Sequence, residues 1–309
     1  MIQRPRPGAV GPVAVGITGG LLLAQPLGLH LAEDVPTAIA TLAILGLGLP
    51  HGAFDIELLR ARAHGGIRQL APILGLYLGV AAAAALVWSV APLAALAGFI
   101  VVAVIHFSED WTGTRSGFLA TGIAAASIAA PALLHTADVA RIFVALTADP
   151  AAALAAKLLA VAAPTALAVA LAGIAALIAE HRRADAAAAA SSLAALVFLP
   201  PVVGFAVFFC LFHSPRHFTA ALRALASPRL ADWIRVAGPV TLAALAIVAV
   251  LYAGHDAGAV PLRLASATFM ALSVLTMPHI LAPRLVGWIE AQVRGPWSVQ
   301  RERSVTYLQ

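Results

Sequence analysis

The strongest constraint on the fold is a succession of long apolar stretches along almost the whole chain. A bilayer core about 30 Å thick is crossed by roughly 20 apolar residues in a helix. Applying this window gives stretches near residues 10–29, 36–60, 69–90, 92–112, 117–135, 151–179, 236–254 and 262–288. Of the 309 residues, 61% are hydrophobic and only 11% are charged, which excludes a soluble enzyme because soluble domains carry about 25% charged residues.

The residue types within these stretches favour helices over strands. Alanine and leucine supply most of the apolar content, and both are strong helix formers, whereas an outer-membrane barrel needs strands of alternating polarity. The sequence therefore predicts an all-α fold, a polytopic membrane helix bundle around a central histidine metal site. We expect one domain over residues 1–309, with an extra helix at 10–29, a core at 30–290 and a cytoplasmic tail at 291–309.

The arginines predict the orientation of the bundle and one further turn. Arg182 and Arg216 both belong on the cytoplasmic side, yet a single span would separate them. A tight turn at Pro200-Pro201 divides the stretch between them into two short antiparallel segments, 186–199 and 201–213. Two crossings return the chain to the cytoplasmic side, where both arginines belong. We therefore expect eight to ten spans, about ten with this turn, in the inner (plasma) membrane with both termini cytoplasmic. The net charge of +5 fits this bias and contact with membrane lipid, and predicts no nucleic acid partner.

Histidine is the most informative residue type in the chain. Five of the ten histidines stand at the ends of apolar stretches, where an interfacial position explains them: His30, His64, His135, His181 and His255. The other five are embedded in apolar sequence: His51, His106, His213, His217 and His279. Each buried ring leaves a donor or acceptor that costs about 1–3 kcal/mol if unpaired. A shared metal ion satisfies several imidazole nitrogens at once, and we therefore predict one.

Depth along the helices supports a shared site. Counted at about 1.5 Å per residue from the outer end of each span, four histidines lie about 18–24 Å deep. These are His51, His106, His213 and His279. Four separate segments are thus predicted to bring imidazoles to a similar level, in the cytoplasmic half of the membrane.

The His213–His217 segment contains a proline that complicates a continuous helix. A spacing of four places both rings on one helical face, but Pro215 between them clashes with the preceding turn. We expect the span to end near His213 and Ser214 to cap a new helix that begins at Pro215.

Acidic residues follow two of the histidines by one helical turn. Asp55 follows His51, and Glu109 and Asp110 follow His106. Metal-bound imidazoles usually donate their second N–H to a carboxylate or carbonyl, so these acids are candidates for that supporting role. The alternative is that they lie at the cytoplasmic interface beside arginines.

The set of nitrogen donors does not identify the metal, but it limits the chemistry of the site. Neutral imidazoles suit iron, zinc, copper or nickel. The single cysteine, Cys210, excludes an intrachain disulfide and a cysteine-ligated cluster. A site of this kind within the hydrocarbon predicts a metal-dependent enzyme that acts on a membrane-dissolved molecule.

Four motifs resemble one family. Gly48-Leu49-Pro50-His51-Gly52-Ala53-x-Asp55, His106-Phe107, His213-Ser214-x-Arg216-His217 and Pro278-His279 together resemble the Brp/Blh family of microbial β-carotene 15,15′-dioxygenases. The resemblance implies an integral-membrane enzyme that uses iron(II), Fe(2+), held by the catalytic residues His51, His106, His213 and His217. His279 would be a further ligand, or would orient substrate or a supporting group.

The resemblance also implies the reaction and its partners. Dioxygen would be added across the central double bond of β-carotene, releasing two molecules of retinal, which the cell could deliver to an opsin. An apolar tunnel would hold the polyene, with aromatic residues near the ligands as its candidate lining: Phe54, Phe107, Trp111, Phe208, Phe209 and Phe212. The alternative for these side chains is helix packing or lipid contact.

Two other classes remain open from the residues alone. A haem or electron-transfer membrane protein uses paired histidines, but two axial ligands per haem leave a fifth histidine and the acids unexplained. A transporter could use a histidine and carboxylate relay. The fixed Pro50-His51-Gly52 and His213-Ser214-x-Arg216-His217 contexts favour a rigid site instead.

Overall fold

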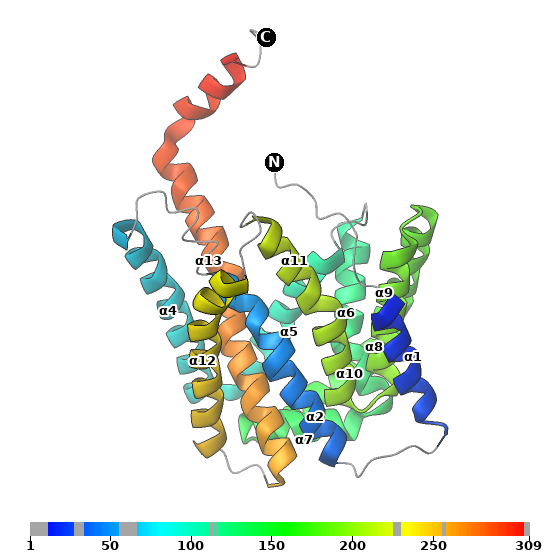
Figure 1. Cartoon of the computed structure of the whole chain (residues 1–309). Helices are drawn as coiled ribbons and strands as arrows, with labels where there is room; N and C mark the ends of the chain where they lie inside the picture. Colours follow the sequence, from blue (N-terminus) through cyan, green and yellow to red (C-terminus); the bar gives the residue numbers. More distant parts are fainter. Residues whose placement is uncertain are drawn as a thin grey trace.

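The computed structural model describes residues 12–27, 34–55, 67–111, 114, 116–224, 230–254 and 258–305. Within these ranges, the side chains of His51 and of residues 67–70, 220–224, 230–237, 282–283 and 285–305 are outside the description. The described segments form helices and short connections and contain no strand, which confirms the all-α prediction. Figure 1 shows a helix bundle beyond which the C-terminal part of the last helix projects.

The regular helices are α1 (Pro12–Ala24), α2 (Asp34–Ala43), α4 (Ile67–Val90), α5 (Pro92–Ser108), α6 (Gly117–Leu134), α7 (Thr136–Thr147), α8 (Ala153–Ala179), α9 (Arg183–Phe198), α10 (Pro201–Val207), α11 (Ser214–Ala224), α12 (Leu230–Gly254) and α13 (Val260–Val305). Between them lie two π-helical turns, η1 (Ile44–Gly48) and η5 (Phe208–His213), and three 3₁₀ turns, η2 (Leu49–Phe54), η3 (Glu109–Trp111) and η4 (Pro150–Ala152).

Six of the described helical segments are long and apolar enough to cross a membrane. They are Asp34–Phe54, Ala71–Val90, Pro92–Trp111, Gly117–Leu134, Pro150–Ala179 and Val260–Leu281. Each coincides with a predicted span to within a few residues at the described ends. The remaining predicted spans correspond to α1, α9, α10 with η5, and the apolar part of α12, Gly238–Gly254. Within the described residues each of these apolar segments is shorter than the roughly 20 residues that cross a bilayer, as expected for 186–199 and 201–213, and the count of eight to ten spans stays a prediction.

The predicted turn at Pro200-Pro201 is present. Helix α9 ends at Phe198 and α10 begins at Pro201. The two helices pack so closely that a Cβ atom on Gly204 would lie 2.7 Å from the carbonyl oxygen of Ala195. Small side chains allow such close approach in membrane helices. The alanine-rich stretch 183–192 is therefore an internal helix of this hairpin, with Ala186, Ala188 and Ala189 buried.

One helix was not expected. The 12-residue helix α7 connects α6 to α8 at the lower end of the bundle in Figure 1 and carries the exposed pair Asp138–Arg141. It is too short and too polar to span a bilayer, which is why the 20-residue apolar window missed it.

Two π-helical turns meet in the interior. The Ser214 hydroxyl, directly after η5, donates a 3.4 Å hydrogen bond to the carbonyl of Gly48, the last residue of η1. In η5 the Ser214 N–H bonds to the carbonyl of Phe209, five residues back. This wider turn accommodates Pro215, whose ring would clash with the carbonyl of Leu211 in a regular α-helix. The prediction that Ser214 caps a new helix is therefore wrong, because helical backbone continues from Pro201 to Ala224.

We predict that Gly48→Ala destabilises the protein, because the new methyl group would lie 2.5 Å from the ring of Phe209. Overpacking of this kind costs about 1–3 kcal/mol and should lower the melting temperature in detergent. The matched control is Gly46→Ala in the same turn, where nothing lies within 4 Å of an added Cβ atom. Equal melting temperatures for the two variants would contradict the close packing of the π turns.

Candidate metal centre

Four histidine rings from four elements lie together inside the bundle. His106 at the end of α5 has its ring centroid 4.8 Å from that of His213, 5.2 Å from His217 and 5.0 Å from His279. The His213 and His217 rings are 4.5 Å apart, and the His217 and His279 rings 5.9 Å apart. The structure thus brings together four of the five histidines that sequence analysis singled out.

Three of these rings have the spacing of metal ligands. His106, His213 and His217 each offer one nitrogen, and these nitrogens all lie within 4.8 Å of one another. The Nε2 atoms of His106 and His213 are 3.2 Å apart, close to the separation of two donors that each lie about 2.0–2.1 Å from one ion. The donors present therefore fit a metal that prefers imidazole nitrogen.

A buried carboxylate supports two of these histidines. The Nδ1–H of His213 donates a 2.8 Å hydrogen bond to Asp110, and the Nε2 of His217 lies 3.3 Å from the other oxygen of the same carboxylate. The Asp110 side chain is only 1% exposed. Carboxylates in this position fix the tautomer and the orientation of a metal-bound imidazole. Asp110 was expected to support His106, the histidine nearest in sequence, and instead contacts His213 and His217.

A second carboxylate holds His279. The Nδ1–H of His279 donates a 2.6 Å hydrogen bond to Asp55, and the hydroxyl of Tyr77 donates to the same oxygen at 3.3 Å. Asp55 is buried, not exposed at the interface. Tyr77 was missed by sequence analysis because α4, which carries it, contains no histidine to draw attention to it.

Glu109, the third predicted acid, is more exposed than the buried carboxylates of Asp55 and Asp110. It pairs with Arg284, and its carboxylate is 4.0 Å from the Nδ1 of His106. That nitrogen is buried and has no hydrogen-bond partner within the part of the chain that the structure describes.

An ionic cluster that the sequence did not reveal lies beside Asp110. The guanidinium of Arg216 stacks 4.4 Å from the centre of the Trp111 ring and donates to the backbone carbonyl of Asp110. It also contacts Asp185, which is paired with Arg182. Arg216 thereby ties α11 to η3 and α9. Its role in the predicted motif is thus to fix the helix that carries His217.

His51 falls on the described backbone of η2, but its side chain is outside the description. The neighbouring residues show that η2 lies against the cluster. Asp55 bonds to His279, and a Cβ atom on Gly52 would lie 3.9 Å from the Nδ1 of His279. Of the histidines assigned to span ends, His135 follows α6, 3.8 Å from Asp138, and His181 follows α8. His30, His64 and His255 lie outside the described residues.

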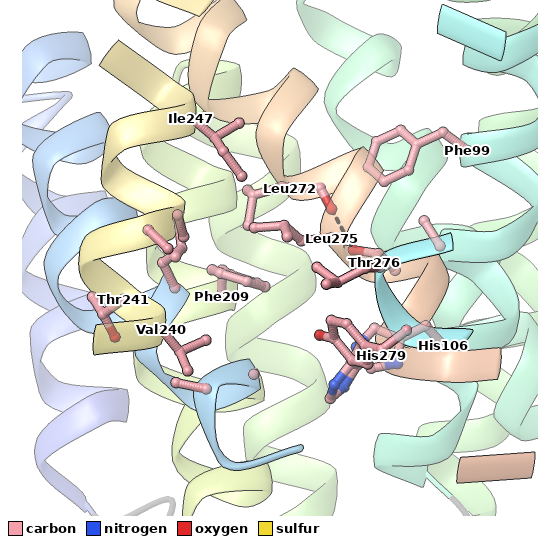
Figure 2. A pocket seen from close by; sticks show the side chains of 18 of the residues that line it. Phe99, His106, Phe209, Val240, Thr241, Ile247, Leu272, Leu275, Thr276 and His279 are labelled. Carbon is pink, nitrogen blue, oxygen red and sulfur yellow. Dashed lines mark hydrogen bonds between the residues drawn. The ribbon is translucent and has the colours of Figure 1, made fainter. Parts of the chain in front are cut away.

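An apolar cavity of about 390 Å³ ends at this centre. Figure 2 shows His106 and His279 side by side at one end of the cavity, with Phe99 and Ile247 toward the other. Its walls come from η2, α4, α5, α10, η5, α12 and α13, and its few polar lining residues are Tyr77, Thr241, Thr276 and the two histidines.

The cavity corrects the predicted aromatic lining. Phe107 and Phe209 line it, whereas Phe54, Trp111, Phe208 and Phe212 are fully buried in helix packing and do not. Phe54, for example, packs edge to face on Phe218, with 5.5 Å between the ring centroids. Phe99 and Phe205 line the cavity although neither adjoins a histidine in sequence. Phe209 also stacks on His213, with ring centroids 5.2 Å apart, and so connects the cavity wall to the metal centre.

These features define a class: an all-helical membrane protein in which an imidazole cluster, supported by buried carboxylates, closes an apolar cavity. The comparisons with known proteins agree with this class. A family model described as beta-carotene 15,15′-dioxygenase matches residues 42–288. The chain therefore belongs to the beta-carotene 15,15′-dioxygenase family.

Two curated relatives carry the same name. A beta-carotene 15,15′-dioxygenase of the uncultured marine bacterium 66A03 is 32% identical over 187 residues, which cover 57% of this chain and 66% of the relative. A probable beta-carotene 15,15′-dioxygenase of Halobacterium salinarum, named Blh, is 28% identical over an alignment of 328 residues covering 93% of this chain and 92% of the relative. No solved structure is significantly similar to the chain.

Proposed function

We propose that this protein is a membrane-embedded, iron(II)-dependent dioxygenase that cleaves β-carotene at its central 15,15′ double bond to give two molecules of retinal. The observation that carries the proposal is an imidazole cluster at the end of an apolar cavity, in a chain of this family. The reaction balances without an added reductant, because the C=C bond is replaced by two C=O bonds and each product takes one atom of dioxygen.

The proposed iron ligands are His51, His106, His213 and His217. The last three are supported by their mutual spacing, and His51 by the position of its neighbours Gly52 and Asp55 against His279. Iron(II), when bound, would supply the redox chemistry that activates dioxygen. For His279 we propose a positioning role at the boundary between the centre and the cavity, since it lines the cavity and is held by Asp55.

The chain's own residues would perform the remaining tasks. Asp110 would hold His213 and His217 in their ligating orientation, and Asp55 with Tyr77 would hold His279. The apolar walls would exclude water and align the rigid polyene, with Phe107 and Phe209 beside its reacting bond. Such alignment of reactants is a major source of rate enhancement in enzymes.

The arrangement of the helices suggests a location and an orientation in the membrane. We propose a position in the inner membrane with both termini cytoplasmic, in which α1, α9, α10 with η5, and α12 join the six longer spans to make about ten membrane segments. Retinal released into the lipid would be available to an opsin. Reporter fusions after α1, α9 and α13 test the orientation, and a periplasmic signal from α13 would contradict it.

The function is tested with purified protein in detergent or vesicles. Incubation with β-carotene and dioxygen should yield retinal as the only aldehyde, and metal analysis should give about one iron per chain. Cys210→Ser should retain the metal, because no thiolate is among the proposed ligands. Full activity with stoichiometric zinc would overturn the dioxygenase, and a Soret absorption band would favour the haem alternative.

We predict that removing the hydrogen bonds that hold His279 lowers turnover, and by more at Asp55 than at Tyr77. Asp55→Asn should keep the fold and bound iron but lower turnover about 10–100-fold, as loss of a supporting carboxylate does at metal sites. Tyr77→Phe removes only the 3.3 Å hydrogen bond to Asp55 and should cost less. Tyr252→Phe is the control, since Tyr252 stacks on Arg263 through its ring, which phenylalanine keeps. Wild-type kcat for Asp55→Asn would remove Asp55 and His279 from the proposed site.

A further inference from the structure

The cavity is partly open, and its exposed lining residues locate the opening. Most lining residues are buried or half-buried, but Leu78 is 66% exposed and Ile247 39% exposed. Pro239 and Ala243 are exposed as well. Residues 239, 243 and 247 are spaced by four, so they form one stripe along α12, and Leu78 stands on α4. The opening is therefore framed by α4 and α12.

The packing of these two helices explains the gap between them. Helix α4 packs against α13 and α5, and α12 packs against α13 and η2. Both helices thus rest on α13, which contributes Leu272, Leu275 and Thr276 to the floor of the cavity. Figure 1 shows α4 and α12 on the same flank of the bundle.

The opening lies within apolar, membrane-length sequence. Leu78 belongs to the candidate span Ala71–Val90, and the α12 stripe falls within the apolar segment Gly238–Gly254. A side opening at this position faces lipid chains rather than water. A hydrocarbon molecule dissolved in the bilayer could reach it without crossing the polar surface.

Away from the histidines the wall is mostly apolar, and two of its three hydroxyl-bearing residues, Thr276 and Tyr77, bond within the protein. The hydroxyl of Thr276 donates to the carbonyl of Leu272 at 2.7 Å, and that of Tyr77 donates to Asp55. Both hydroxyl hydrogens are therefore used within the protein. A polyene with no polar group would leave no buried donor of these two residues unpaired.

We propose that the opening between α4 and α12 is the lateral passage by which β-carotene enters from the bilayer, and that Leu78 and Ile247 set its width. This inference rests on the proposed function. Ala243, the smallest side chain on the α12 stripe, stands between Pro239 and Ile247 and lines the cavity. At the histidine end, Asp110 and His213 are 1% and 0% exposed, whereas the lining residues Leu78 and Ile247 are 66% and 39% exposed, so we place entry at the latter.

The test measures binding separately from cleavage. β-Carotene in vesicles is mixed with iron-loaded protein under nitrogen, and association is followed by quenching of the fluorescence of the protein's five tryptophans. The double variant Leu78→Phe/Ile247→Phe narrows the opening. It should associate about tenfold more slowly, because α4 and α12 must first part. Leu78→Ala/Ile247→Ala should associate at least as fast as wild type.

The control variant is Leu86→Phe/Val250→Phe, which adds the same bulk to the same two helices. Leu86 and Val250 are 62% and 71% exposed and do not line the cavity. This control should associate like wild type, with equal iron content. After a long anaerobic incubation, admission of dioxygen should give the wild-type single-turnover rate in Leu86→Phe/Val250→Phe, because neither of its two residues lines the cavity.

The outcomes separate the two proposals. Equal association rates for the wild type and both phenylalanine variants would overturn the lateral passage while leaving cleavage intact. Slow association in Leu78→Phe/Ile247→Phe alone would uphold the passage. If the wild-type protein also formed no retinal after oxygen is admitted, the dioxygenase would be overturned while the passage stood. Slowing in Leu86→Phe/Val250→Phe to the same extent would also overturn the passage, since bulk anywhere on the two helices would then suffice.

Discussion

Replacing His213 by alanine is expected to remove bound iron and to lower β-carotene cleavage by more than about 100-fold, beyond the loss of a merely supporting group. His213 is fully buried, its Nε2 lies 3.2 Å from that of His106, and its Nδ1 is fixed by Asp110. The readouts are iron per chain by elemental analysis and retinal formed per minute.

His135→Ala is the matched control for this loss. Like His213, His135 lies at a helix end beside a carboxylate, but it is half-buried, its partner is Asp138 and it lies outside the cluster. It should keep both iron and activity. An active His213→Ala protein with normal iron content would show that the proposed ligand set is wrong.

The second large effect is expected at Asp110. Replacement by alanine would remove the acceptor of the buried His213 Nδ1–H and the carboxylate oxygen 3.3 Å from the His217 Nε2, and a buried donor left unpaired, such as that of His213, costs about 1–3 kcal/mol. Asp110→Asn keeps the shape but can accept from only one of the two rings. We expect Asp110→Asn to weaken iron binding about 10–100-fold, and Asp110→Ala to weaken it further.

Iron retention against a graded series of chelators measures this effect independently of catalysis. The control is Asp138→Asn, which removes an exposed carboxylate paired with Arg141. Wild-type iron retention in Asp110→Asn would mean that the carboxylate is not needed to orient the two imidazoles, and the arrangement proposed for the site would then fail.

Regular helical geometry is why part of the site could be predicted from sequence. A helix rises by a constant amount per residue, so counting from span ends placed His106, His213 and His279 at one depth. The three rings do lie near one another in the structure. The 20-residue apolar window located the described ends of the six full-length spans, and the sidedness of the arginines located the hairpin at Pro200-Pro201.

Contacts between helices could not be predicted in this way. Asp55 was expected to support His51, its neighbour by one turn, which lies outside the described side chains, and its bond to His279 from α13 was not expected. Tyr77 and Asp185 take part in the site's surroundings from helices that have no motif of their own. The aromatic lining was misjudged for a related reason. Adjacency in sequence to a ligand does not determine which face of a helix looks into a cavity, especially beside π turns.

The π turn η5 has a consequence for how this chain tolerates insertions and deletions. A π turn holds one residue more than the α turn it replaces, while the helix on either side keeps its own phase. Deleting Cys210 would let the segment from Pro201 onward close into a regular α-helix, and the ring of Pro215 would then meet the carbonyl of Leu211. A proline that the present backbone accommodates would become a helix breaker between two of the proposed ligands. The number of residues before Pro215, and not only their identity, is thus part of what holds His213 and His217 together.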